Sequence, residues 1–542
     1  MKGSVRRPGS FHSVRLGNPL AFWLGCVGVV AGVVLHLPMF LMGRDRGYVL
    51  AGMPMDAGML WGMLLIVAGM AATAFGLLPR APAPSSGGPS QFAPRPQGRL
   101  GRAHWALGGL LVVALIIDIM KPATLGFVMP GVRKEYSLAA RAAAWLPLVA
   151  LAGTALGSYL WGMLADRFGR RASILLASVM FIGTSICGAM PDFKWNVLMC
   201  LLMGLAAGGM LPVVYALLTE IIPLRQRGWF LVLVGGVGAV GGYFAASELS
   251  ALLQPLFGWR IMWLLGLPTG AILVVLSPLI PESPRFLQLM GREEEMRAEL
   301  ARFSMAPVTA LERGTVYPPT EVAAARRRWR RDAMMAALSC AGFAWGLVNL
   351  GLLVWIPDSL VAHGATAASA SALLARSTLL SVPVIVLCAC LYRYWSRKGT
   401  LLLFTALMGL GLLAVLAQQG GWGPNSGATV SLALLIVGSC GVIAVLLPYT
   451  GESYRASVRG RATGWVAGVS KFGGLLAQGL AVLGVAPVFA VAAGAVAFIT
   501  FVALVLIVWF CDDTRERDVD EADLLQGPGL AHRSLPAPLR AA

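Results

Sequence analysis

Charged residues are scarce in this sequence. Only 13% of its 542 residues are Asp, Glu, Lys or Arg, while 57% are hydrophobic. A water-soluble protein carries about 25% charged residues, so this chain has about half of the charge that a wetted surface normally uses. The composition therefore excludes a disordered chain and argues strongly against a soluble enzyme.

Several chemical signatures are also missing. The eight cysteines lie in or beside apolar runs without metal-finger spacing, so we interpret them as packing residues. The five histidines show no catalytic or metal-ligand spacing, and there is no nucleophile motif and no Gly-rich Lys-Ser/Thr loop for ATP phosphates. Methionines cluster around His36 and Asp56, where thioethers would suit Cu(I), but apolar packing is the interpretation that we prefer. We expect no enzyme activity, no cofactor and no resident metal.

Long apolar runs dominate what is present. A bilayer crossing takes about 20 apolar helical residues, and fourteen runs approach or exceed that length. They are continuous rather than alternating, which excludes a membrane β-barrel and predicts an all-α polytopic membrane protein. The runs cover residues 19–42, 57–78, 104–130, 142–164, 172–190, 195–218, 229–253, 261–281, 333–357, 367–392, 400–418, 428–449, 463–484 and 487–511.

Lysines and arginines are unevenly divided between the two sides of the membrane. With a cytoplasmic N-terminus and alternating crossings, 33 of the 43 lie in cytoplasmic segments, seven lie outside and three lie within runs. The positive-inside rule favours this orientation, which makes both termini cytoplasmic. The same bias accounts for the net charge of +18 without a nucleic-acid partner.

Three polar stretches divide the chain into a two-helix extension and two six-helix blocks. They are a Pro-, Ser- and Gly-rich linker at 79–103, a charged loop at 282–332 and a tail at 512–542. The domains that we predict are the N-terminal two-helix extension and linker 1–100, the N-terminal six-helix half 101–290, the central loop 291–331, the C-terminal six-helix half 332–511 and the cytoplasmic tail 512–542.

The two six-helix blocks carry matching motifs. Glu220 follows the fourth helix of the first block, and six residues later comes Arg227 with a glycine after it. Glu452 and Arg459 repeat this spacing, again before a glycine, in the second block. Paired six-helix repeats are typical of transporters whose halves rock about a central site.

One stretch carries a family resemblance. The sequence from Gly157 to Arg171 resembles the loop between the second and third helices of the major facilitator superfamily. Its motif positions are Gly162, Asp166, Arg167, Gly169, Arg170 and Arg171. The run Pro281 to Leu287, and Asp118 followed by Leu125 to Pro130, resemble the sugar porters and the aromatic-acid/proton symporters. The resemblance covers residues 104 to about 521 and implies two six-helix halves, with the extra N-terminal pair making fourteen helices in total.

The sequence departs from this family pattern in two places. The acid symporters usually carry a second acidic residue three positions after the first, where this chain has Lys121. The second-half copy of the loop motif, around Arg393 to Lys398, lacks the Asp and the glycines.

Ionisable residues within the runs are candidates for the transport pathway. Asp118 lies ~21 Å into the membrane from the start of its helix, and Lys121 shares its helix face, so the two can pair. Such groups are costly at membrane depth and usually mark substrate or proton routes. Substrate competing for Lys121 would release Asp118 to take up a proton, whereas a static packing pair is the alternative.

Further candidates lie in the second half. The charged residues that we expect to be buried inside the runs are three cations, Lys121, Lys471 and Arg376, and one acid, Asp118. A cavity with this excess of positive charge favours binding of an anion such as a carboxylate. Snorkelling of Arg376 to the interface and a salt bridge of Lys471 are the alternatives. By the resemblance, Asn349 and Tyr215 lie on helices that line the cavity, although helix packing explains each of them alone.

The loop motif suggests a gate. Asp166 can cap the next helix, while Arg167, Arg170 and Arg171 can bridge to acidic partners in the other half. The repeated pairs Glu220/Arg227 and Glu452/Arg459 are candidate partners in such a two-state contact. The alternative is that these arginines only set the membrane topology.

We predict a bacterial inner-membrane secondary transporter of the major facilitator class. It is expected to take up a small organic anion with protons and to work as a monomer. Three alternatives stay open: efflux of a drug-like compound or metabolite, sugar transport, and a non-transporting sensor or scaffold whose helix pair binds a partner.

Overall fold

The structure, a computed structural model, confirms the predicted helical membrane architecture. It describes residues 18–77, 92–94, 99–307, 321–417, 426–454, 456–484 and 489–513. Within these ranges, fourteen helical segments are long and apolar enough to cross a membrane.

Each part of the chain contributes a consecutive set of elements. The extension and linker contain α1 (Pro19–Val34), α2 (Leu37–Met42), the 3-10 helix η1 (Arg44–Arg46), α3 (Ala57–Leu77) and β1 (Phe92–Pro94). The first half contains α4 (Arg102–Glu135), α5 (Ala140–Ala143), α6 (Trp145–Phe168), α7 (Arg170–Gly183), η2 (Thr184–Ala189), α8 (Phe193–Ala207), α9 (Met210–Ile221), α10 (Leu224–Phe257), α11 (Ile261–Leu264), α12 (Gly266–Leu276) and η3 (Ser277–Leu279). The loop region contains α13 (Pro284–Leu289), α14 (Glu293–Arg302) and β2 (Met305–Pro307). The second half contains α15 (Glu321–Gly346), the π-helix η4 (Leu347–Leu352), α16 (Leu353–Ala362), α17 (Ala367–Leu379), α18 (Ser381–Tyr394), α19 (Arg397–Ala417), α20 (Ser426–Ser453), α21 (Ala456–Leu483) and α22 (Phe489–Phe510).

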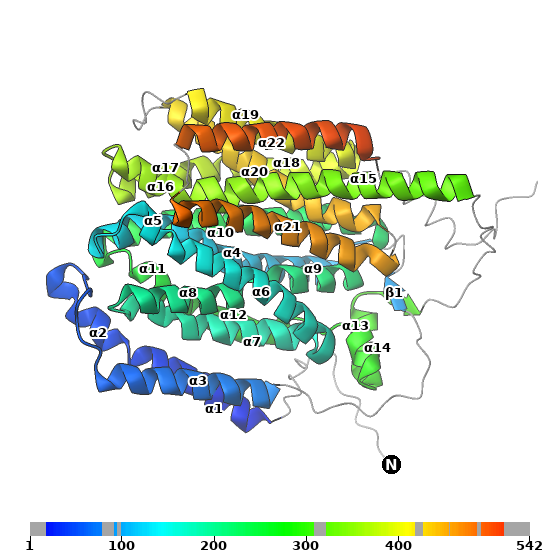
Figure 1. Ribbon diagram of the computed structural model, residues 1–542. Coiled ribbons are helices and arrows are strands. Elements are labelled where there is room, and N and C mark those ends of the chain that lie inside the picture. Colours follow the sequence, from blue (N-terminus) through cyan, green and yellow to red (C-terminus); the bar gives the residue numbers. More distant parts are fainter. Residues whose placement is uncertain are drawn as a thin grey trace, which may run out of the picture.

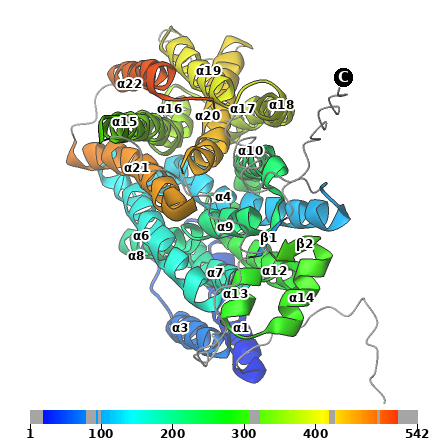
Figure 2. The ribbon, with the colours of Figure 1, turned by 90° about the vertical axis from the view of Figure 1, so that its right-hand side faces the viewer.

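The two halves and the extension lie one above another when the bundle is viewed along its axis (Figure 2). The main contacts of the second half with the first are those of α17, α18 and α20 with α10, of α16 with α4, and of α21 with α6. Helices α1 and α3 lie on the far side of the first half, where they contact α7. The interface between the halves is therefore remote from the extension.

The bundle has two distinct ends (Figure 1). One end carries α13, α14 and β1, and we call it the α13 end. The opposite end carries α2, α5 and α11, and we call it the α2 end. At the α13 end, β1 pairs antiparallel with β2, which joins the linker to the segment after α14.

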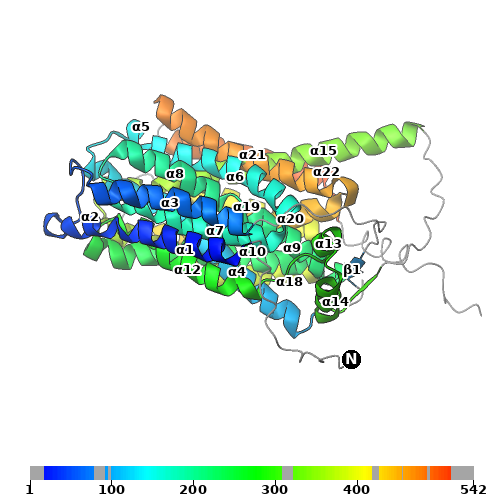
Figure 3. The same cartoon turned by 90° about the horizontal axis from the view of Figure 1, so that it is seen from below.

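Helices α1 and α3 form a tight antiparallel hairpin, because glycines line their contact (Figure 3). A Cβ atom on Gly69 would lie 2.7 Å from the Gly25 carbonyl oxygen, and one on Gly76 would lie 2.7 Å from the Asn18 carbonyl oxygen. Small residues allow helix backbones to approach closely in a membrane. The hairpin also shares a hydrophobic cluster with the first half, in which Val29 and Met59 are fully buried.

Candidate functional site

Asp118 is a buried carboxyl group near the middle of α4. The residue is 4% exposed, and no hydrogen-bond donor from the described residues reaches its buried Oδ1. Pro122 lacks an N–H group, so the Asp118 carbonyl also lacks its usual donor four residues later. An ionised carboxylate without donors is costly in such a site, and a proton removes that cost. Asp118 is thus suited to binding and releasing a proton.

Lys471 connects the second half to the first. It lies on α21, and its Nζ donates to the Ser158 hydroxyl and to the Thr154 carbonyl at 3.5 Å, both on α6. The charges of Lys471 and of Lys121 both act on the Asp118 carboxyl. The structure thus joins a cation of the second half to α6 of the first half, and the sequence analysis missed Thr154 and Ser158 as its partners.

Lys121 is bound inside the first half. Its Nζ donates to the Phe181 carbonyl at 2.7 Å and to the Thr184 hydroxyl at 3.2 Å, and lies 4.7 Å from the centroid of the Phe181 ring. These acceptors lie where α7 gives way to η2, and a cation is favourable at a helix C-terminus. Among the described residues, no hydrogen bond or ion pair joins Lys121 to Asp118, so the expected direct contact is not formed in this structure.

Asn349 lies in the π-helix η4 and contacts α20. Its Nδ2 donates to the Ser439 hydroxyl at 3.0 Å, and the Trp345 indole donates to the Ser439 carbonyl at 2.9 Å. From α21, Gln478 donates to the Leu350 carbonyl of η4 at 2.8 Å. π-Helical turns often occur at functional sites, and here side chains of two neighbouring helices hold one.

The other two candidates for the transport pathway, Tyr215 and Arg376, differ in their exposure. Tyr215 is half-buried on α9, and Gly235 of α10 makes room for it, since a Cβ there would lie 1.9 Å from the Tyr215 hydroxyl. Arg376 is exposed on α17. These observations associate Tyr215 with packing against α10 and leave the pathway role of Arg376 a prediction.

A charge cluster at the α13 end contains the motif arginine Arg170. Its guanidinium binds Glu220 at 2.9 Å and Asp166 at 3.1 Å, and its backbone N–H donates to Glu282 at 2.8 Å. Gly169 has φ +101°, and a Cβ there would lie 2.5 Å from the Glu282 carboxylate. This explains the glycine at the motif position. Among the described residues, Arg170 bonds within its own half in this structure rather than across to the other.

The second half repeats this cluster. Arg397 opens α19 as Arg170 opens α7, and it binds Glu452 at 3.1 Å. Its backbone N–H donates to Asp513 at 3.3 Å, which corresponds to the bond between Arg170 and Glu282. The second copy of the motif therefore keeps its arginine–glutamate contact although its Asp and glycines are missing.

The remaining motif residues have separate environments. Gly162 has open space around its Cα, Arg167 lies 5.5 Å from the Phe168 ring centroid, and Arg171 is half-buried near Glu282. Arg227 donates to the Ile222 carbonyl at 3.4 Å. The predicted role of Arg459 concerns a side chain outside the described residues, and it stays a prediction.

Contacts between the halves occur at both ends of the bundle. At the α13 end, Arg393 of α18 lies 4.7 Å from the Trp229 ring centroid of α10. At the α2 end, Arg133 of α4 forms an ion pair with Asp358 of α16. Both contacts must break in turn if the halves rock about the centre.

We predict a pH effect at Glu282. Burial raises the pKa of its carboxyl above the ordinary 4.5, although N–H donors from Ser283 and Arg170 oppose the shift. The folded state then holds its proton to higher pH than the unfolded chain does, so ionisation above pH 4.5 costs stability. Compared with the Glu282→Gln variant, the wild-type protein should lose thermal stability as the pH rises from 4.5, the ordinary pKa of this carboxyl, towards neutrality. Apparent unfolding temperatures in detergent test this, and parallel curves for the two proteins would contradict it.

Comparisons with known proteins agree with this architecture. The family model described as Major Facilitator Superfamily matches residues 110–416. The niacin transporter NiaP of Acinetobacter baylyi is 28% identical over 70% of this chain and 86% of its own length, and the benzoate transport protein of the same organism is 26% identical over 69% and 82%. The putative niacin/nicotinamide transporter NiaP of Bacillus subtilis is 25% identical over 68% and 85%. A partially occluded, inward-open structure of the xylose transporter XylE from E. coli superposes with a TM-score of 0.59, at 15% identity, over 76% of this chain and 98% of that one.

Proposed function

The chain belongs to the Major Facilitator Superfamily and is a membrane transporter, and from this premise we propose that it takes up a small organic acid as its anion together with protons. The observation that carries the proposal is the buried carboxyl of Asp118, whose Oδ1 has no hydrogen-bond partner among the described residues and which the charge of Lys471 attracts from the opposite half. A proton acceptor and an anion-binding cation then lie together between the parts that move.

Charge balance supplies the coupling in this proposal. In the empty transporter we propose that Asp118 is ionised and that Lys471, whose charge attracts it, compensates it across the interface. In the loaded transporter, protonated Asp118 is neutral and the substrate carboxylate compensates Lys471. A transporter that holds only a proton or only the anion keeps an uncompensated buried charge, which is strongly unfavourable. Rocking is therefore favoured only when proton and anion are both bound or both absent.

The named relatives support the substrate class. Niacin and benzoate are both carboxylic acids on a six-membered aromatic ring, and transporters of both match more than two thirds of this chain. We propose an aromatic monocarboxylate as the substrate, with the carboxylate at Lys471. Lys and Arg are the usual partners of carboxylates in proteins.

The orientation follows from the distribution of positive charge. We propose that the α13 end faces the cytoplasm of a bacterial cell, because segments at that end hold most lysines and arginines. The ion pair between Arg133 and Asp358 then lies at the outer side, and the two arginine–glutamate clusters lie at the inner side. We propose that the ion pair between Arg133 and Asp358 is part of an outer gate and that the two arginine–glutamate clusters are part of an inner gate. We also propose that one copy of the chain is sufficient for transport.

The test is uptake into liposomes that contain the purified protein. Labelled nicotinate and benzoate are compared with xylose, with and without an inward proton gradient, and protein-free liposomes correct for passive entry of the neutral acids. At one proton per anion, a tenfold proton gradient supports up to about tenfold accumulation. We expect the carboxylates to accumulate and xylose not to do so. Uptake of xylose alone, or carboxylate uptake that ignores the gradient, would refute the proposal.

A further inference from the structure

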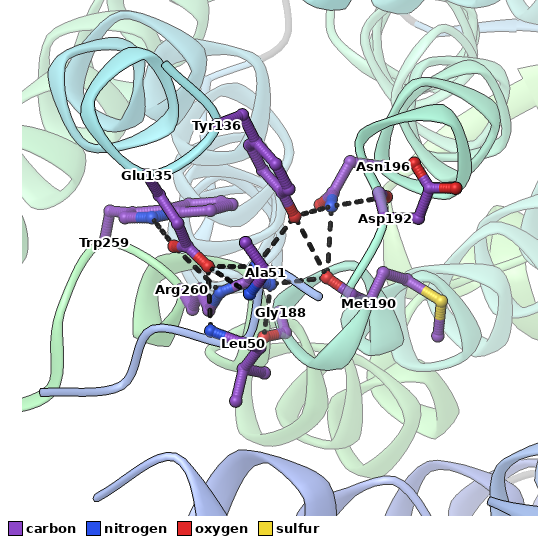
Figure 4. Close-up of polar contacts among 10 residues, drawn as sticks. All are labelled: Leu50, Ala51, Glu135, Tyr136, Gly188, Met190, Asp192, Asn196, Trp259 and Arg260. Atoms are coloured by element: carbon purple, nitrogen blue, oxygen red, sulfur yellow. Dashed lines mark hydrogen bonds and ion pairs between the residues drawn. The ribbon is translucent and has the colours of Figure 1, made fainter. Parts of the chain in front are cut away.

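Glu135, the last residue of α4, is the centre of a buried polar cluster (Figure 4). Its carboxylate accepts hydrogen bonds from Arg260 Nη2 at 2.7 Å and Arg260 Nε at 3.2 Å, and from the Trp259 indole at 2.7 Å. Arg260 is fully buried, and it also donates to the Met190 carbonyl at 2.6 Å and to the Tyr136 hydroxyl at 2.8 Å. The end of α4 is thus fixed to the loops before α8 and α11.

The same carboxylate binds the N-terminal extension through its backbone. The N–H groups of Leu50 and Ala51 both donate to Glu135 Oε1, at 2.8 and 3.0 Å. Leu50 to Met53 form a tight turn, in which the Met53 N–H donates to the Leu50 carbonyl at 3.1 Å and Gly52 has φ +80°. This is the pattern of a type II turn, whose third position needs a positive φ. The turn presents two adjacent donors to one buried acid.

The extension has further attachments, and they also lie in the first half. Tyr48 packs edge-on against Phe257 at the end of α10, with ring centroids 5.8 Å apart. Helices α1 and α3 contact α7, and α2 contacts η2. The extension is therefore fixed to the half that contains Asp118.

The turn lies beside the outer gate. Arg133, two residues before Glu135 on α4, forms the ion pair with Asp358 of the second half. The last turn of α4 therefore contacts the extension at Glu135 and the opposite half at Arg133. Glu135 therefore links the extension to the helical turn that carries the gate arginine.

We propose that Glu135 is a positioning residue through which the N-terminal helix pair stabilises the closed outer gate. With the Leu50–Ala51 turn bound, the end of α4 is fixed and Arg133 meets Asp358. With the turn released, the ion pair weakens and the transporter spends more time open to the outside. This inference concerns the gate, and it depends on neither the substrate nor the proton.

Ala51→Pro is the variant that tests the proposal. Ala51 is the second residue of the turn, where proline is favoured, so the substitution is compatible with the turn itself; it removes the N–H donor to Glu135 and places the ring Cδ where that hydrogen lay, which moves the turn away from the carboxylate. Ala57→Pro is the matched control, because Ala57 is the first residue of α3, where an N–H has no helical partner and proline is tolerated. Spin labels at the exposed residues Ala139 and Ala362 report the separation of the halves at the outer side by electron–electron double resonance.

Losing a hydrogen bond to a charged group changes an equilibrium constant by about tenfold. Because Arg260 and Trp259 still hold Glu135, we expect a smaller effect for Ala51→Pro, about a threefold rise in the ratio of outward-open to outward-closed transporter. Ala57→Pro should match the parent protein. Ala51→Pro should add little to Asp358→Asn, which breaks the gate directly, because a substitution that acts through the ion pair has no further effect once the pair is absent. Equal distances in both proline variants, or fully additive effects of Ala51→Pro and Asp358→Asn, would overturn the proposal. If Ala51→Pro does not fold, Gly52→Val replaces it with the same expected direction and the same contradicting result, because a β-branched residue disfavours φ +80° and strains the turn while the Glu135–Arg260 ion pair is kept.

Discussion

Asp118→Asn is expected to abolish gradient-driven uptake while leaving exchange of substrate across the membrane intact. Asparagine has nearly the size of protonated aspartic acid but cannot release a proton, so the variant stays in the state that accepts the anion. The stimulation by a tenfold proton gradient should fall from up to about tenfold to none. Uptake with and without the gradient, together with counterflow of labelled substrate, separates loss of coupling from loss of transport.

Asp118→Glu is the control for this prediction. Glutamate keeps a titratable carboxyl with one additional methylene, so part of the gradient stimulation should remain. If Asp118→Asn keeps full stimulation, the proton is carried elsewhere and the buried carboxyl has only a packing role. If Asp118→Asn loses exchange as well, the acid is needed for substrate binding or folding rather than for coupling alone.

Lys471→Gln should raise the KM for a carboxylate substrate by about 10- to 100-fold, the factor expected for losing a charge-assisted contact. The effect should depend on the charge of the substrate. Nicotinate and nicotinamide differ only in the carboxylate, so the variant should lose its preference for the acid over the amide. Competition of each unlabelled compound with labelled nicotinate measures this preference directly.

Lys121→Gln is a matched lysine control for Lys471→Gln. Because Lys121 binds the Phe181 carbonyl and the Thr184 hydroxyl, its loss should lower thermal stability without changing the preference for acid over amide. Lys471→Arg should keep that preference, since it keeps the charge. A loss of preference in Lys121→Gln with an unchanged Lys471→Gln would show that the wrong cation has been assigned to the substrate.

The architecture is readable from the sequence because membrane crossing is a local property. Each run is apolar over its own length, and no distant contact is needed to recognise it. All fourteen predicted runs correspond to helices that can span a membrane. The family resemblance is confirmed for the same reason, since its most specific motif, from Gly157 to Arg171, is a short contiguous stretch.

The partners of the buried charges are less readable. Spacing along α4 predicts that Asp118 and Lys121 can meet, but Lys121 binds a carbonyl 60 residues away, at a helix end that no side-chain pattern reveals. The contact between Lys471 and Ser158 spans 313 residues. Sequence spacing identifies which charges are buried, whereas only the packing of α6, α7 and α21 decides which groups they meet.

Two features stay hidden for a more general reason. Arg397 binds Glu452 although the rest of the loop motif is missing around it. The residue types of the motif alone therefore do not reveal that the second half repeats the arginine–glutamate contact of the first. The extension is held by the backbone N–H groups of Leu50 and Ala51, and nearly every residue type supplies that donor. Neither contact has a signature in residue identity, although the glycine at position 52 indicates a turn.

The central claim is that protons and an organic anion cross together, and substrate-driven proton movement tests it most directly. Liposomes with a pH-sensitive dye inside receive nicotinate or benzoate outside, with no initial proton gradient and the membrane potential clamped. The account predicts that the wild-type protein acidifies the interior faster than protein-free liposomes do, and that Asp118→Asn does not. Entry of labelled substrate through the wild-type protein without such acidification would contradict it.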